Sequence, residues 1–73
     1  MKIGMLWLDD YKGRSLEEKV ERAAAYYGDK YGRKPELCFV NPEMLSAEKT
    51  INSIVVQTAA SIQPNYFWLG NPA

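Results

Sequence analysis

The chain contains no histidine and only one cysteine, Cys38. Without an imidazole, the commonest general base, the cysteine–histidine nucleophile pair and most zinc sites are unavailable. A lone cysteine cannot form an internal disulfide bond, and we expect Cys38, which lies between Leu37 and Phe39, to be a buried thiol. These absences argue against ordinary hydrolase chemistry and leave carboxylate or tyrosine chemistry open, so we predict a non-enzymatic protein with no cofactor.

The chain also lacks a net charge, because nine Lys and Arg residues balance nine Asp and Glu residues. No overall field therefore attracts nucleic acid or an anionic membrane. No leader-like segment or apolar run of membrane-spanning length is present, and we expect a cytoplasmic protein. The charges are unevenly placed, since residues 50 to 73 contain no Lys, Arg, Asp or Glu.

A length of 73 residues predicts one domain, residues 1 to 73. A chain of this size buries only about 60% of the surface that its unfolded form exposes, so its stability is marginal unless something adds to it. The sequence shows no internal repeat and no low-complexity segment.

Apolar and polar spacing predicts one long helix and four strands. Ser15 and Glu18 form a capping-box pattern that begins the helix, and Gly32 with Pro35 places its end near Tyr31. The predicted strands are residues 2–8, 36–40, 50–58 and 66–69. A short helical turn follows Asn41, and residues 59–63 are expected to close a hairpin between the last two strands.

This order, β-α-β, a short helical turn, then β-β, predicts a two-layer sandwich of the α/β or α+β class. We expect a mixed four-stranded sheet with the long helix on one face. A strand–helix–strand unit of this length normally crosses over to a parallel neighbour, so we expect the first two strands to pair in parallel.

Asp9 and Asp10 follow the first predicted strand directly. Adjacent carboxylates at a strand end are candidate ligands for a divalent cation, but successive residues on a strand point to opposite sides. We interpret the pair as a solvated strand exit, and a carboxylate-based metal site or enzyme using Asp9 and Asp10 remains the alternative.

Aromatic and basic residues gather near the predicted end of the helix. Such a cluster is typical of single-strand nucleic-acid binding, in which bases stack on rings and phosphates pair with cations. We favour core packing for the rings and solvation for the cations, and keep a nucleic-acid accessory role as a further alternative. The cluster comprises Tyr26, Tyr27, Lys30, Tyr31, Arg33 and Lys34.

Every predicted strand is apolar on both faces, whereas one helix can cover only one face of a sheet. The second face therefore needs another cover, and a second copy of the chain is the simplest one, because stacked sheets would form a helix–sheet–sheet–helix sandwich. We predict a homodimer, or failing that a complex with another protein, and expect the interface to contain Ile54, Val56, Tyr66 and Trp68.

Four segments carry a resemblance to a known family: MKIGMLWLDD, SLEEKVERAAAYY, LCFVNPEML and PNYFWLG. The chain resembles a family of short uncharacterised prokaryotic proteins over most of its length. The resemblance implies no activity, because none is attached to the family. Relatives have histidine at the positions of Asn41 and Tyr66, which puts in doubt any metal or acid–base role of those positions here.

Overall fold

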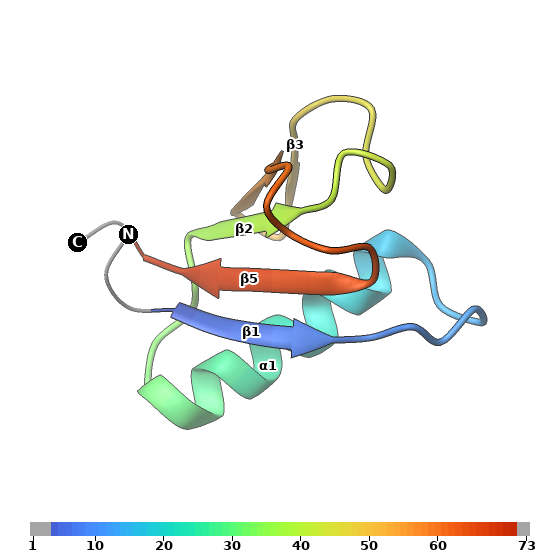
Figure 1. Cartoon of the computed structure of the whole chain (residues 1–73). Coiled ribbons are helices and arrows are strands. Elements are labelled where there is room, and N and C mark those ends of the chain that lie inside the picture. Colours follow the sequence, from blue (N-terminus) through green and yellow to red (C-terminus); the bar gives the residue numbers. More distant parts are fainter. Residues whose placement is uncertain (1–3, 72–73) are drawn as a thin grey trace.

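The computed structural model describes residues 4 to 71, which form one helix and five strands (Figure 1). The elements are β1 (Gly4–Leu8), α1 (Leu16–Tyr31), β2 (Leu37–Val40), β3 (Lys49–Ile51), β4 (Ile54–Thr58) and β5 (Tyr66–Gly70). The α+β character is confirmed, with α1 on one face of a mixed sheet. Residues 2 and 3 of the first predicted strand lie outside the described residues.

The sheet has five strands and not the predicted four, because the segment 50–58 is split by a turn. Asn52 and Ser53 have φ angles of 50° and 68°, which places both residues in the left-handed region. Consecutive positive φ angles are the mark of a tight hairpin turn of the type that suits twisted strands. The chain therefore reverses at these two residues, and β3 pairs antiparallel with β4.

The strand order β1-β5-β2-β4-β3 also differs from the expected pairing. The final strand, β5, lies antiparallel between β1 and β2, so these two parallel strands are not neighbours. The one parallel pair among the described strands is β2 with β4. The expected hairpin between the last two strands is wrong, because residues 59–65 carry the chain past β2 to the far side of that strand. The result is a split β-α-β unit with an antiparallel strand inserted.

The boundaries of α1 follow the sequence signals. The Ser15 hydroxyl accepts a hydrogen bond from the Glu18 backbone N–H (3.2 Å), and the Glu18 carboxylate accepts one from the Ser15 N–H (3.1 Å). At the other end, Gly32 adopts φ 75° and its N–H donates to the Gly28 carbonyl. The predicted capping box and the predicted end near Tyr31 are both confirmed.

The predicted short helical turn after β2 is an ordinary turn. The Asn41 side-chain oxygen accepts a hydrogen bond from Glu43 N–H (2.8 Å), and the Asn41 carbonyl accepts one from Met44 N–H (2.9 Å). The first bond uses the side chain of Asn41 and the second its backbone carbonyl to close the turn, and no helix is formed there. The Asn41 amide also donates to the Ile62 carbonyl (2.8 Å), which ties this turn to the segment between β4 and β5.

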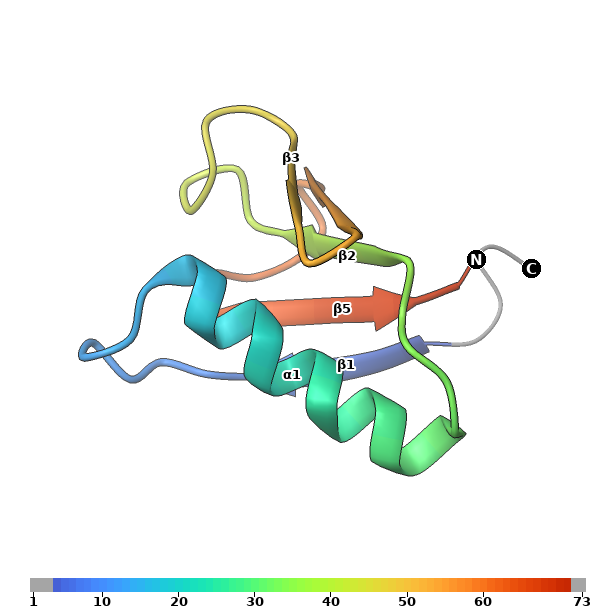
Figure 2. The same cartoon turned by 180° about the vertical axis from the view of Figure 1, so that it is seen from behind.

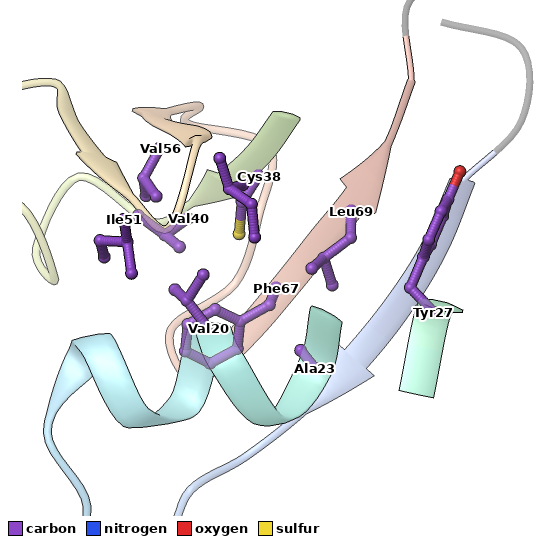
Figure 3. Close-up of a cluster of buried hydrophobic side chains, with 10 residues drawn as sticks. Val20, Ala23, Tyr27, Cys38, Val40, Ile51, Val56, Phe67 and Leu69 are labelled. Carbon is purple, nitrogen blue, oxygen red and sulfur yellow. The ribbon is translucent and has the colours of Figure 1, made fainter. Parts of the chain in front are cut away.

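The core lies between α1 and the face of the sheet that α1 covers (Figure 3). Val20, Ala23 and Tyr27 project from the helix onto side chains of the strands. Six of the strand residues have no exposed surface: Cys38, Val40, Ile54, Val56, Phe67 and Leu69. The predicted burial of Cys38 is confirmed. Among residues 4 to 71 no helix is both long and apolar enough to span a membrane.

Candidate functional site

Within residues 4 to 71, no second layer of secondary structure covers the face of the sheet opposite α1 (Figures 1 and 2). Side chains alternate across a strand, so each buried core residue has neighbours along the chain that point to this side. We call this side the open face. Its residues are Leu6 and Leu8 of β1, Tyr66 and Trp68 of β5, Leu37 and Phe39 of β2, Val55 and Gln57 of β4, and Thr50 of β3.

No described strand places a charged side chain on the open face. At its β4 side the Glu48 carboxylate, from the segment before β3, accepts a hydrogen bond from the Gln57 amide (2.8 Å). Lys49, the charged residue of β3, pairs in register with the core residue Val56 and reaches Glu17 of α1 on the opposite face (2.6 Å). Leu6 and Leu8 are 59% and 51% exposed. An apolar surface of this kind is a typical signature of an interaction site.

Trp68 is the middle residue of β5 and lies on the open face between β1 and β2. It pairs in register with Leu6 of β1 on one side and with Phe39 of β2 on the other. The Phe39 and Trp68 ring centroids are 5.9 Å apart at an interplanar angle of 45°. The indole also lies against Gly4, where a β-carbon would overlap the ring. Neighbours on both strands therefore hold the Trp68 side chain in place.

The segment between β4 and β5 borders the open face and shapes it. Ile62, from this segment, lies beside Trp68 and contributes to two adjoining shallow grooves. One groove runs between Phe39 and Ala59, and the other runs between Leu6 and Tyr66. The open face is consequently a surface of ridges and grooves around the Trp68 ring, which is the form of a binding hot spot.

Only two of the four predicted interface residues lie on this surface. Tyr66 and Trp68 are on the open face, whereas Ile54 and Val56 point toward α1 and have no exposed surface. The turn at Asn52 and Ser53 starts β4 at Ile54 and so sets the side to which each of its residues points. Sequence reasoning passed over Leu6, Leu8 and Phe39, although the alternation within the two strands carried the signal.

Asp9 and Asp10 do not form a joint site. The Asp9 carboxylate is buried and is held by Arg14 through two contacts, from Nε (3.1 Å) and Nη2 (3.3 Å), and by the Tyr11 N–H (3.1 Å). Asp10 is exposed. A cation at Asp9 would have to displace the guanidinium, and residues 4 to 71 contain no group of three side chains suited to a metal ion.

The pKa of Asp9 reflects two opposed effects. Burial disfavours the charged carboxylate and on its own raises the pKa. The hydrogen bonds from Arg14 and from the Tyr11 N–H, with the positive charges of Arg14 and Lys19, outweigh burial and lower the pKa below its usual value. Asp9 is thus a stable anion that anchors the loop between β1 and α1, and it is not poised to exchange protons near neutral pH.

The aromatic residues near the end of α1 do not form one cluster, because each packs against a different part of the protein or against its own neighbour. Tyr27 is buried and its hydroxyl accepts a hydrogen bond from the Asn71 amide (2.9 Å). Tyr31 packs against Tyr27, with ring centroids 4.6 Å apart. Tyr26 packs instead on Trp7 of β1, with centroids 4.3 Å apart. The three rings therefore do not make one platform on which successive bases would stack.

Comparison of the chain with known protein families, curated proteins and solved structures finds no match. The resemblance to a family of short prokaryotic proteins stays a prediction.

Proposed function

We propose that this is a non-enzymatic, cytoplasmic protein that acts through association, and that its open face packs against the open face of a second copy. The observation that carries the proposal is the apolar and aromatic surface that β1, β5 and β2 form around Trp68, opposite the face that α1 covers. The surface needs an occupant as uncharged as itself, and a second open face meets that requirement.

Symmetry supports a homodimer. In an isologous contact the same patch meets itself, so ridges of one copy must fit grooves of the other. The open face offers both elements, because Leu6 projects into solvent beside the groove that Ile62, Tyr66 and Trp68 line. Two sheets stacked in this way lie about 10 Å apart and form a four-layer sandwich, which adds buried apolar area to a chain too small to bury much alone.

Light scattering coupled to size-exclusion chromatography tests the proposal directly. The wild-type chain of 8.3 kDa is expected to elute with twice that mass. Trp68→Arg places a charge from each copy inside the symmetric contact, so this variant should elute as a monomer.

Tyr11→Arg is the matched control, because Tyr11 is an exposed aromatic residue (57%) in the loop after β1 and away from the open face. It should remain dimeric. A wild-type protein that stays monomeric at about 1 mM, where even weak interfaces are occupied, refutes the homodimer. Equal behaviour of the two arginine variants would move the interface away from Trp68.

A further inference from the structure

We propose that the free edge of β1 binds an extended peptide strand whose apolar and acidic residues alternate. This site uses the backbone of β1 and one flank of α1, and it shares only Leu6 and Leu8 with the open face. The proposal rests on three features of the edge: free backbone groups, a lack of protective charge, and a helix that shapes the space beside it.

The backbone groups of Leu6 and Leu8 point away from the sheet. Asp9 N–H donates to the Asn65 carbonyl (2.9 Å), and these two residues extend the register of β1 with β5 by one pair. Hydrogen-bonded and non-hydrogen-bonded pairs alternate in an antiparallel ladder. Trp7 and Met5 therefore bond to β5, whereas the N–H and C=O groups of Leu6 and Leu8 face the open side of β1.

The strand itself lacks charge and proline, two of the devices with which sheets usually block further pairing. From Gly4 to Leu8 the strand contains no charged residue and no proline, and β1 pairs with β5 alone among the described strands. At the opposite edge of the sheet, β3 is only three residues long and includes Lys49. Edge strands are normally protected by such shortness and charge, so an unprotected β1 is suited to strand addition.

The position of α1 decides which occupant fits. The helix crosses the sheet obliquely, and its C-terminal half extends past β1 on the covered side (Figure 2). Two copies that paired antiparallel through their β1 edges would place both helices on the same side of the joined sheet, so a second copy would bring a helix of its own to this edge. A single extended segment brings no helix, and it would lie with one row of side chains over the flank of α1.

The charge on that flank specifies the peptide. Tyr26 stacks on Trp7, which identifies the side of α1 that faces β1. Arg22 and Lys30 lie one turn before and one turn after Tyr26 on the same stripe, and both are exposed. The exposed Asp29 borders the same stripe, and the Lys30 ammonium lies over the Tyr31 ring (5.4 Å). Among residues 4 to 71 neither cation takes part in a salt bridge. Acidic residues in the row facing α1 would pair with them.

The other row of peptide side chains would point to the open-face side of β1. Leu6 and Leu8 project there and are more than half exposed. In an added strand, residues opposite and diagonal to these leucines come within contact distance, so apolar side chains extend the surface already present. The preferred sequence thus alternates, with acidic residues toward α1 and apolar residues toward Leu6 and Leu8.

The test is a titration of the ¹⁵N-labelled full chain with the synthetic peptide acetyl-Glu-Val-Glu-Val-Glu-Val-Glu-amide, followed by NMR. The amide signals of Leu6 and Leu8 should shift most, and those of Met5 and Trp7 should shift less because their N–H groups already bond to β5. The same peptide with lysine in place of glutamate should bind more weakly. Shifts spread evenly over the chain, no shift at millimolar peptide, or equal binding of both peptides would refute the proposal.

Two variants at one position isolate the backbone bond. Leu6→Pro and Leu6→Ala both remove the leucine side chain, but only proline also removes the outward N–H. Proline at this position leaves the bonds to β5 intact and is tolerated on an edge strand. Leu6→Pro should bind the acidic peptide roughly fivefold to tenfold more weakly than Leu6→Ala, as expected for a lost hydrogen bond. Equal affinities would show that the peptide does not add to β1.

The charge requirement has its own control pair. Arg22→Ala combined with Lys30→Ala should weaken binding of the acidic peptide severalfold and reduce its dependence on salt. Lys34→Ala removes a cation that lies beyond the end of α1 and should leave binding unchanged. In the Trp68→Arg variant, in which the open faces should no longer associate, concentration-dependent shifts of the Leu6 and Leu8 amides without any peptide would instead assign the edge to a second copy and overturn the peptide assignment.

Discussion

The indole of Trp68 lies across Gly4, so closely that a β-carbon at Gly4 would overlap the ring. Gly4 and Trp68 are on neighbouring strands, two residues out of register, and both face the open side of the sheet. Glycine here provides space for an aromatic ring, a common reason for glycine within a strand. The pair links the start of β1 to the open face.

Gly4→Ala should therefore displace the Trp68 ring and lower the free energy of unfolding by about 1–3 kcal/mol, the usual cost of forcing an extra methyl group into a packed site. Urea denaturation measures the loss, and the shift of the Trp68 indole proton in NMR reports the displacement. A stable variant with an unmoved indole would show that the ring does not rest on Gly4.

Gly28→Ala provides a control of opposite sign. Gly28 lies inside α1, and a β-carbon there would meet nothing within 4 Å. Alanine is favoured over glycine in a helix interior by about 1 kcal/mol. The same glycine-to-alanine change should thus stabilise the protein at position 28 and destabilise it at position 4.

Asp9→Asn should destabilise the protein at neutral pH, because it removes the charge that holds Arg14 and fixes the loop before α1. A hydrogen bond to a charged group contributes about 1.5–3 kcal/mol, and the loss should fall in or below that range since Arg14 is partly exposed. Asp10→Asn, at an exposed neighbour, should change stability by less than about 0.5 kcal/mol.

The stability difference between wild type and Asp9→Asn should shrink as the pH falls. The folded-state pKa of Asp9 lies below its unfolded value, so the folded protein binds this proton less readily than the unfolded chain does. The stabilisation is complete above the unfolded pKa, near about pH 4, and disappears as the pH falls through the lower folded-state pKa. Urea denaturation of wild type and Asp9→Asn between about pH 7 and pH 2 should show the two curves converging in acid; a constant gap contradicts the role of the carboxylate charge.

The sequence predicts α1 well because its signals are local. Ser15, Glu18 and Gly32 each act on a helix end within a few residues of themselves, and the structure uses all three as expected. The burial of Cys38 follows equally from its immediate neighbours. Nothing distant along the chain needs to be known for these features.

The order of the strands depends on distant contacts, and there the prediction failed. The insertion of β5 between β1 and β2 is decided by which apolar faces cover one another under α1, with Phe67 and Leu69 completing the core. Spacing in the sequence shows that a strand is apolar, but not which strand lies beside it. The sequence therefore predicted that an apolar sheet face lacks a cover. Which residues lie on that face, and that Ile54 and Val56 do not, depends on the fold.

The missed hairpin has a more specific cause. Tight turns with two positive φ angles usually have glycine at the second position, which makes them recognisable in a sequence, but here that residue is serine. Ser53 adopts φ 68° although a side chain disfavours this region. The segment 50–58 consequently has the composition of one continuous strand.

Ser53→Gly should stabilise the protein by about 1 kcal/mol, because glycine adopts this conformation without the steric cost of a β-carbon. Thermal or urea unfolding measures the gain. Ser46→Gly, in the exposed segment before β3, where no positive φ is found, should be neutral or slightly destabilising, since glycine there only adds freedom to the unfolded chain. Equal effects at both positions would argue against a strained turn at Ser53.

Cys38 tests the placement of β2 in the interior of the sheet. Its thiol has no exposed surface, and burial raises its pKa to about 12. Because the thiolate is the reactive species, both accessibility and ionisation oppose modification of the folded protein. Iodoacetamide at about pH 8 should label native protein far more slowly than protein in denaturant, with Lys12→Cys, in the loop after β1, as an exposed-thiol control that reacts in both. Rapid native labelling of Cys38 would mean that β2 separates readily from α1 and that the core between them is not the stable centre of the fold.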